Sequence, residues 1–125
     1  MAEHKGFQDL VADAKKNITE ISPTDAAQKA KSSEVVIVDV REKEEYFAGH
    51  IQGATNIRRE LLEVTASEIA PDRTVAILVY SAAGNQGALA ADSLQKLGYL
   101  NVFSLKGGLS GWLEAGGLVE TRSAR

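Results

Sequence analysis

The stretch Thr74-Val-Ala-Ile-Leu-Val-Tyr80, followed directly by Ser81-Ala-Ala-Gly-Asn-Gln-Gly87, decides the fold of this chain. The first seven residues form an apolar run that predicts a buried strand. The next seven, with two glycines, predict a tight loop that leads into a helix over residues 88–97. In such a loop, successive backbone N–H groups point into one hollow, and the helix N-terminus adds about half a positive charge. The loop is therefore the leading candidate for binding a negatively charged reactive atom.

On both sides of this stretch, expected strands alternate with expected helices. The other apolar or alternating runs predict strands at residues 18–21, 35–38, 54–57 and 101–105. Helices are expected at residues 3–16, from Ser22 and Pro23 onward, and at 42–47, 60–67 and 109–115. This order indicates an α/β fold with a mostly parallel sheet, flanked by helices on both faces. In such sheets ligands bind beyond the carboxyl ends of the strands, where Ser81 lies.

The composition narrows the classes of function. With 125 residues, 44% of them hydrophobic, the chain suits one domain, in which residues 1–20 form an N-terminal helix and first strand packed on residues 21–125. The net charge of −3 argues against nucleic acid or a membrane surface as a partner, and the sequence lacks an apolar span, so a cytoplasmic protein is expected. Without cysteine, we expect no disulfide, no metal site and no cofactor. The polar residues 120–125 are expected to fray.

Three groups of residues, in order along the chain, carry a family signature. The first comprises Asp39-Val-Arg41, Glu45-Tyr46 and Gly49-His-Ile-Gln-Gly-Ala-Thr-Asn56. The second is the loop 81–87 with its flanking residues, and the third comprises Gly98-Tyr99, Asn101-Val102, Gly107-Gly108, Trp112 and Gly116. Together they resemble the rhodanese family, and the helix expected at residues 3–16 resembles an extension of some single-domain bacterial members.

The resemblance implies a sulfurtransferase. In that family a loop cysteine takes sulfane sulfur from thiosulfate or a similar anionic donor, holds it as a persulfide, and passes it to cyanide, a thiol or an acceptor protein. Loop N–H groups and a helix N-terminus stabilise such anions. The implied site consists of Ser81 at the catalytic position and the binding loop Ala82, Ala83, Gly84, Asn85, Gln86 and Gly87.

Two positions depart from the family pattern. Ser81 stands where the resemblance implies cysteine, and a hydroxyl is hardly ionised at neutral pH and forms no stable equivalent of a persulfide. The chain as written is therefore predicted to be inactive. Gln86 stands where many members have arginine or lysine, which weakens the expected electrostatic capture of a dianionic donor.

Three further residues are candidates for supporting roles. Asp39 and Arg41 lie two apart at the end of a strand, and either line the pocket or, as we favour, fix loops through a buried ion pair. His50 is either a general base or, as we favour, a hydrogen-bonded loop residue. The charged run 42–45 is interpreted as a solvated helix face.

Two other functions stay open at this stage. The first is a naturally cysteine-less binding or regulatory module, in which the hollow still attracts small anions. The second, a phosphatase with a similar loop, requires cysteine and an arginine five residues later, where this chain has Ser81 and Gln86.

Overall fold

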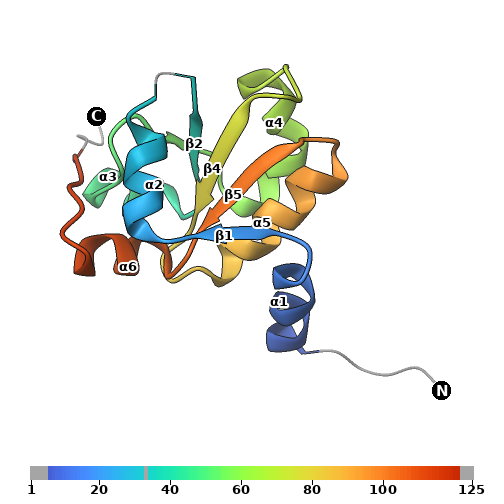
Figure 1. The fold of residues 1–125 in the computed structure, drawn as a ribbon, viewed down its shortest axis with the longest axis horizontal. Coiled ribbons are helices and arrows are strands. Elements are labelled where there is room, and N and C mark those ends of the chain that lie inside the picture. The colour runs from blue at the N-terminus through green and yellow to red at the C-terminus, as the bar shows by residue number, and fades with distance from the viewer. Residues whose placement is uncertain (1–5, 33, 122–125) are drawn as a thin grey trace.

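A five-stranded parallel sheet forms the centre of the computed structural model, which describes residues 6–32 and 34–121. The strands stand in the spatial order β1-β5-β4-β2-β3 (Figure 1). Their bounds are Thr19–Ile21 for β1, Val36–Asp39 for β2, Thr55–Asn56 for β3, Ala76–Tyr80 for β4 and Asn101–Leu105 for β5. The α/β class with a parallel sheet is thus confirmed, and β4, which ends at the loop 81–87, lies in the middle of the sheet.

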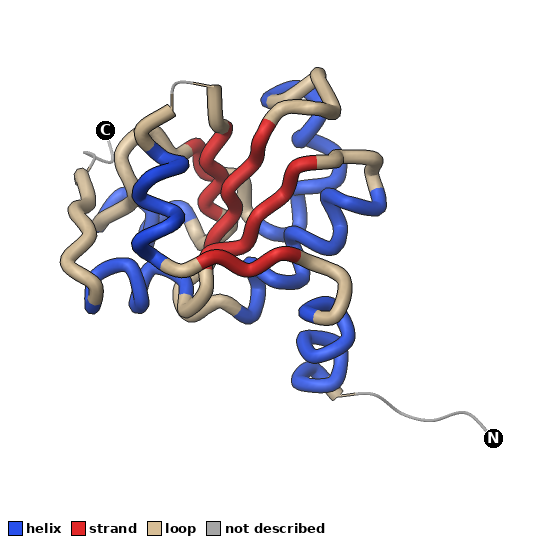
Figure 2. Tube along the Cα trace, viewed as in Figure 1, coloured by secondary structure: helices blue, strands red, loops and turns tan. Residues whose placement is uncertain are grey.

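Helices cover both faces of the sheet, as the alternation of strands and helices predicts (Figure 2). On one face, α5 (Asn85–Lys96) contacts α1 (Phe7–Lys15) and α4 (Leu62–Ile69), which follows a short 3-10 helix, η1 (Arg59–Leu61). On the other face lie α2 (Pro23–Ala30), α3 (Lys43–Ala48) and α6 (Gly108–Glu114). Ser22 caps α2 by accepting a hydrogen bond from the Asp25 amide, at 3.1 Å, in agreement with the Ser-Pro start signal.

The central strand is apolar along its whole length because both of its faces are covered. Ile77 and Val79 pack in the cluster beneath α4 and α5, whereas Leu78 and Tyr80 pack in the cluster beneath α2, α3 and α6. All four side chains are buried. Successive strand residues point to opposite faces, so only a continuous apolar run can fill both cores.

Most boundaries shift from the expectation by one or two residues, and two differences have a clear structural cause. Helix α5 begins at Asn85 rather than at residue 88, because Gly84 adopts φ +105° and turns the chain so that the second half of the loop is already helical. Glu120 does not fray: it exchanges two backbone hydrogen bonds of 2.9 Å with His50. Residues 122–125, and residues 3–5 of the first expected helix, lie outside the described part. Over the described residues, no helix is long and apolar enough to cross a membrane.

Candidate active site

Ser81 lies at the carboxyl end of β4, with only 5% of its surface exposed. Its Oγ accepts hydrogen bonds from the N–H groups of Gly84 and Gly87, each 3.0 Å long. The seven-residue loop therefore curls around its own first side chain. Ser81 Oγ therefore occupies the point toward which the amides of Gly84 and Gly87 converge.

The loop is fixed from below by the start of α6. The carbonyl groups of Ser81 and Ala82 accept hydrogen bonds from the amides of Leu109 and Ser110, at 2.8 and 3.0 Å. Gly108 makes this approach possible: it has φ +58°, and a Cβ there would lie 2.5 Å from the Ser81 carbonyl oxygen. Glycine is thus required at position 108, within the Gly107-Gly108 pair, because the backbone of the loop and the backbone of α6 meet there.

Four backbone donors of the loop are free. Among residues 6–32 and 34–121, no acceptor bonds the N–H groups of Ala82, Ala83, Asn85 or Gln86. Two of these amides belong to the first turn of α5, where the helix dipole favours negative charge. The loop can therefore hold an anion through its backbone, with no contribution from a charged loop side chain.

A pocket of about 390 Å³ opens beside Ser81. It lies where the loop, the start of α3 and the segment around η1 meet. Its lining comprises Val40, Arg41, Glu42, Glu45, Arg59, Glu60, Ser81, Ala82 and Gln86. Of the residues expected to support the site, only Arg41 lines this pocket, whereas Asp39 and His50 do not.

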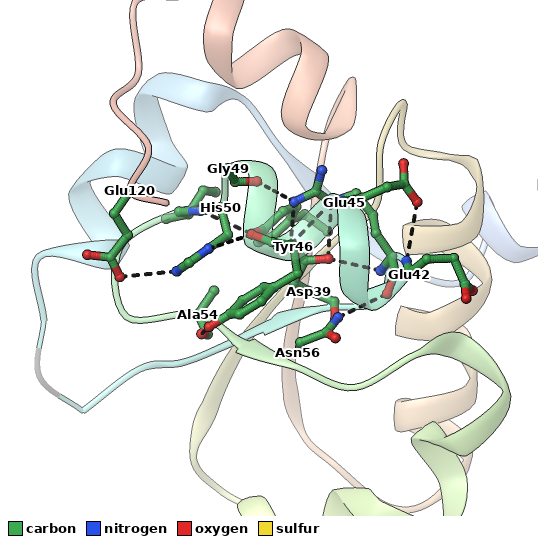
Figure 3. Close-up of polar contacts among 12 residues, drawn as sticks. Asp39, Glu42, Glu45, Tyr46, Gly49, His50, Ala54, Asn56 and Glu120 are labelled. Atoms are coloured by element: carbon green, nitrogen blue, oxygen red, sulfur yellow. Dashed lines mark hydrogen bonds and ion pairs between the residues drawn. The ribbon is translucent and has the colours of Figure 1, made fainter. Parts of the chain in front are cut away.

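Asp39 and Arg41 form a buried ion pair (Figure 3). Asp39 is fully buried, and the Arg41 side chain is 8% exposed. Arg41 Nη2 lies 2.8 Å from Oδ2 and also donates to the carbonyl of Gly49, while Nε contacts both carboxylate oxygens at 3.1 and 3.2 Å. Burial alone would lower the pKa of Arg41, but the hydrogen bonds and charge of Asp39 outweigh it and raise that pKa. The expected buried ion pair is thus present, and its role in fixing loops stays a prediction.

The same pair orders the segments around it. The Arg41 amide donates to Asp39 Oδ1, at 2.9 Å, and the Asn56 side-chain amide donates to the carbonyls of Asp39 and Arg41 (Figure 3). Below the pair, the Tyr80 hydroxyl accepts a hydrogen bond from the Ile51 amide, at 3.1 Å. Burial, together with the Asp39 charge, raises the pKa of Tyr80 far above its ordinary value, so the phenol stays neutral.

His50 serves a different part of the molecule. Its Nδ1 lies 2.7 Å from the carbonyl oxygen of Tyr46, and its Nε2 lies 3.2 Å from Glu120 Oε1 (Figure 3). The ring also stacks on Tyr46, with the centroids 3.8 Å apart. Both ring nitrogens thus have partners within this cluster, and a loop-fixing role for His50 stays a prediction. The partner of His50, Glu120, could not be predicted, because a single acidic residue in a polar tail forms no recognisable sequence motif.

The acids at the pocket mouth were also missed. The run 42–45 is exposed, as a solvated helix face should be, but Glu42 and Glu45 line the pocket, as do Arg59 and Glu60. The signal that could have found them is position, since each follows closely on the end of β2 or β3, at the same edge of the sheet as Ser81.

The strand-loop-helix site at the carboxyl edge of a five-stranded parallel sheet fits the architecture that the rhodanese resemblance implies. The Rhodanese-like domain family matches residues 22–115, and the chain belongs to that family. A curated relative, the thiosulfate sulfurtransferase GlpE of Shewanella oneidensis, is 34% identical over 95 residues, which cover 76% of this chain and 92% of the relative.

Solved structures share the fold of this chain. RPA3614 of Rhodopseudomonas palustris, described as a protein of unknown function and possible tyrosine phosphatase, aligns with a TM-score of 0.84 and 29% identity, covering 96% of this chain and 98% of that one. The polysulfide-sulfur transferase homodimer of Wolinella succinogenes aligns with a TM-score of 0.79 and 25% identity, covering 95% and 90%.

Proposed function

We propose that the loop 81–87 is the sulfur-transfer site of a rhodanese-type sulfurtransferase in which Ser81 holds the place of the nucleophile, so that this chain transfers no sulfur. The observation that carries the proposal is the position of Ser81 Oγ, which two loop amides hold at 3.0 Å while four further loop amides have no acceptor among the described residues. A thiolate or persulfide at the same place would meet the same donors.

The rhodanese resemblance implies the chemistry of the cysteine form, and the loop geometry is compatible with it. A thiolate at position 81 attacks the sulfane sulfur of thiosulfate, sulfite leaves with the bonding electron pair, and a persulfide anion remains. An acceptor thiolate or cyanide then attacks the outer sulfur, and the protein thiolate leaves. The loop amides stabilise the negative charge in each state. The serine hydroxyl is a poor nucleophile without a base, and neither ring nitrogen of His50 is directed toward it.

The test is the full-length Ser81→Cys variant. We expect its thiol to have a pKa below that of a free cysteine, because the loop amides and α5 stabilise the thiolate. After incubation with thiosulfate or polysulfide, mass spectrometry should show the gain of one sulfur atom, which cyanide or a reducing thiol removes. The unchanged chain and a Ser81→Ala variant are the matched controls and should gain nothing.

The alternative is a binding module of the same family that never used a thiol. It is favoured by the way Ser81 satisfies two loop amides, which leaves a stable, neutral hollow. A folded Ser81→Cys variant with an ordinary thiol pKa and no sulfur uptake from several donors would overturn the sulfurtransferase proposal in favour of this module. A cytoplasmic location, a small anionic donor, and a thiol, cyanide or protein acceptor stay predictions.

A further inference from the structure

The charge of the pocket mouth beside Ser81 does not suit a small dianion. Glu42, Glu45 and Glu60 line the mouth, and Glu42 and Glu60 have side chains that are 60% and 63% exposed. Exposed carboxylates at an entrance repel approaching anions and attract cations, an effect that acts mainly on the association rate.

The two arginines of the lining do not reverse this charge. Arg41 is held by the buried Asp39 carboxylate. Arg59 directs Nη1 to both carboxylate oxygens of Glu63, at 3.0 and 3.1 Å, and Nη2 to Ser93 Oγ, at 2.8 Å. Each guanidinium is therefore neutralised by an acid of its own, and the three glutamates of the mouth remain.

One further cation stands at the rim. Arg58 lies 3.9 Å from Glu42 and 3.7 Å from Glu60, through long, exposed contacts of the kind that contribute little. It offsets one of the three carboxylates. The nearby Lys43 has its ammonium group 5.5 Å from the Phe47 ring centroid and does not line this pocket. The mouth keeps a net negative charge, and Gln86 adds no positive charge to it.

The surface beside the mouth is larger than a small molecule requires. A second hollow of about 390 Å³ shares Glu42 with the first and is also lined by Lys43, Glu44, Arg58 and Leu61, so its acidic and basic side chains balance and the negative charge belongs to the first hollow. Leu61 and Val64 are exposed apolar side chains on η1 and α4, next to Glu60. The two adjoining hollows, with the apolar Leu61 in the lining of the second, suit an extended segment of polypeptide.

We propose that the pocket beside Ser81 receives a basic polypeptide segment, in which lysine or arginine flanks a cysteine that exchanges sulfur with position 81, in preference to free thiosulfate. The inference rests on the proposed function of the loop. Glu42 and Glu60 are the specificity-determining residues, because their carboxylates are exposed at the mouth and make no hydrogen bond with the loop 81–87 in the described structure. Glu45 has a second role, since its carboxylate accepts a hydrogen bond from the Glu42 amide at the start of α3.

The test measures how fast the thiol of the Ser81→Cys variant attacks cysteine peptides activated as mixed disulfides with thionitrobenzoate. Attack forms the protein–peptide disulfide and releases the coloured thiolate. Peptides with two arginines beside the cysteine should react about tenfold faster, at low ionic strength, than matched peptides with two glutamates, and the ratio should shrink with added salt.

Matched variants separate the effect of Glu42 and Glu60 from that of the net charge of the protein. Adding Glu42→Gln and Glu60→Gln should reduce the ratio about threefold or more, and glutamine keeps a hydrogen-bond acceptor at both positions. Adding Glu68→Gln and Glu114→Gln, which remove two exposed carboxylates elsewhere, changes the net charge equally and should leave the ratio as it was. Equal ratios in the two variants, or a ratio independent of salt, would overturn the proposal.

Two further outcomes separate the parts of the reasoning. A small cationic thiol, cysteamine, and an anionic thiol of similar size are activated and compared in the same way. If their rate ratio equals that of the basic and acidic peptides, Glu42 and Glu60 select charge alone and the polypeptide partner is refuted. The disulfide assay needs no persulfide. A Ser81→Cys variant that prefers basic peptides but takes up no sulfur therefore refutes the proposed function, and not the charge preference of the pocket.

Discussion

Replacement of Asp39 by alanine should destabilise the fold and leave the loop intact as an anion site. Asp39 is fully buried, and its loss leaves the Arg41 guanidinium, 8% exposed, with the Gly49 carbonyl as its one hydrogen-bond acceptor among the described residues, beside the Tyr80 ring 5.8 Å away. The Arg41 amide loses its acceptor as well. Removing one partner of a buried ion pair typically costs about 3–5 kcal/mol, because the other charge stays buried and uncompensated.

This loss of folding stability is large enough to measure by thermal unfolding. With an unfolding entropy of about 2.1 cal/mol/K per residue, it corresponds to a fall in Tm of about 10–20 °C. Thermal unfolding followed by circular dichroism measures this fall, and titration with sulfate measures the loop. Because Asp39 does not line the pocket, the sulfate affinity at temperatures well below Tm should be nearly unchanged.

Two controls make the result specific. Asp92→Ala removes an ion pair of 3.1 Å with Lys96, whose side chain is 76% exposed, and should cost less than about 1 kcal/mol. The double variant Asp39→Ala, Arg41→Met should be more stable than Asp39→Ala alone, because no unpaired charge remains buried. An unchanged Tm for Asp39→Ala, combined with a lost affinity for sulfate, would refute this reasoning and place Asp39 in the binding machinery.

Two further perturbations test the backbone approach and the buried phenol. Gly108→Ala should lower the free energy of unfolding by about 2–4 kcal/mol, because its Cβ would lie 2.5 Å from the Ser81 carbonyl oxygen. The control Gly53→Ala, at φ +86° with open space around it, should lower it by about 1 kcal/mol. Equal losses of stability in urea unfolding would contradict the close approach at Gly108. Tyr80→Phe should cost about 1–3 kcal/mol, because the buried Ile51 amide loses its acceptor. Since the pKa of Tyr80 is raised in the folded protein, the unfolded chain ionises first and stability falls as the pH rises above about 10; the phenylalanine variant should fall less steeply, and parallel pH profiles would argue against the shift.

The elements that the sequence predicted well are those whose own residues determine them. The apolar run that contains β4 has no alternative to a buried strand, and Ser22 with Pro23 marks the start of α2 by local chemistry alone. The position of Ser81 at the carboxyl edge follows from the parallel topology without knowledge of any side-chain contact.

The elements that were missed depend on residues far away in the sequence. Glu120 is held in place by His50, seventy residues earlier, through a ring contact and two backbone hydrogen bonds. The early start of α5 depends on Gly84, whose left-handed conformation is permitted by its own lack of a Cβ, but whose position close to the amide of Gly107 is a tertiary feature. Local patterns indicate where such residues are, and only the packed chain shows what they contact.

At the proposed site, different groups provide anion binding and partner selectivity: backbone amides of the loop provide the first, and the side chains at the pocket mouth provide the second. In the proposed site the loop binds an anion through backbone amides, so any sequence that keeps Gly84 and Gly87 and packs on the start of α6 provides the donors, whichever atom residue 81 presents to them. Selectivity lies with Glu42 and Glu60, which belong to the starts of α3 and η1 and make no hydrogen bond with the loop in the described structure. The two properties can therefore vary independently. A change at position 81 should switch sulfur uptake on without altering the charge preference, and a change at the rim should alter the preference without affecting the thiolate in the hollow. If neutralising the rim also abolished sulfur uptake by the Ser81→Cys variant, the two would be coupled and this separation would be wrong.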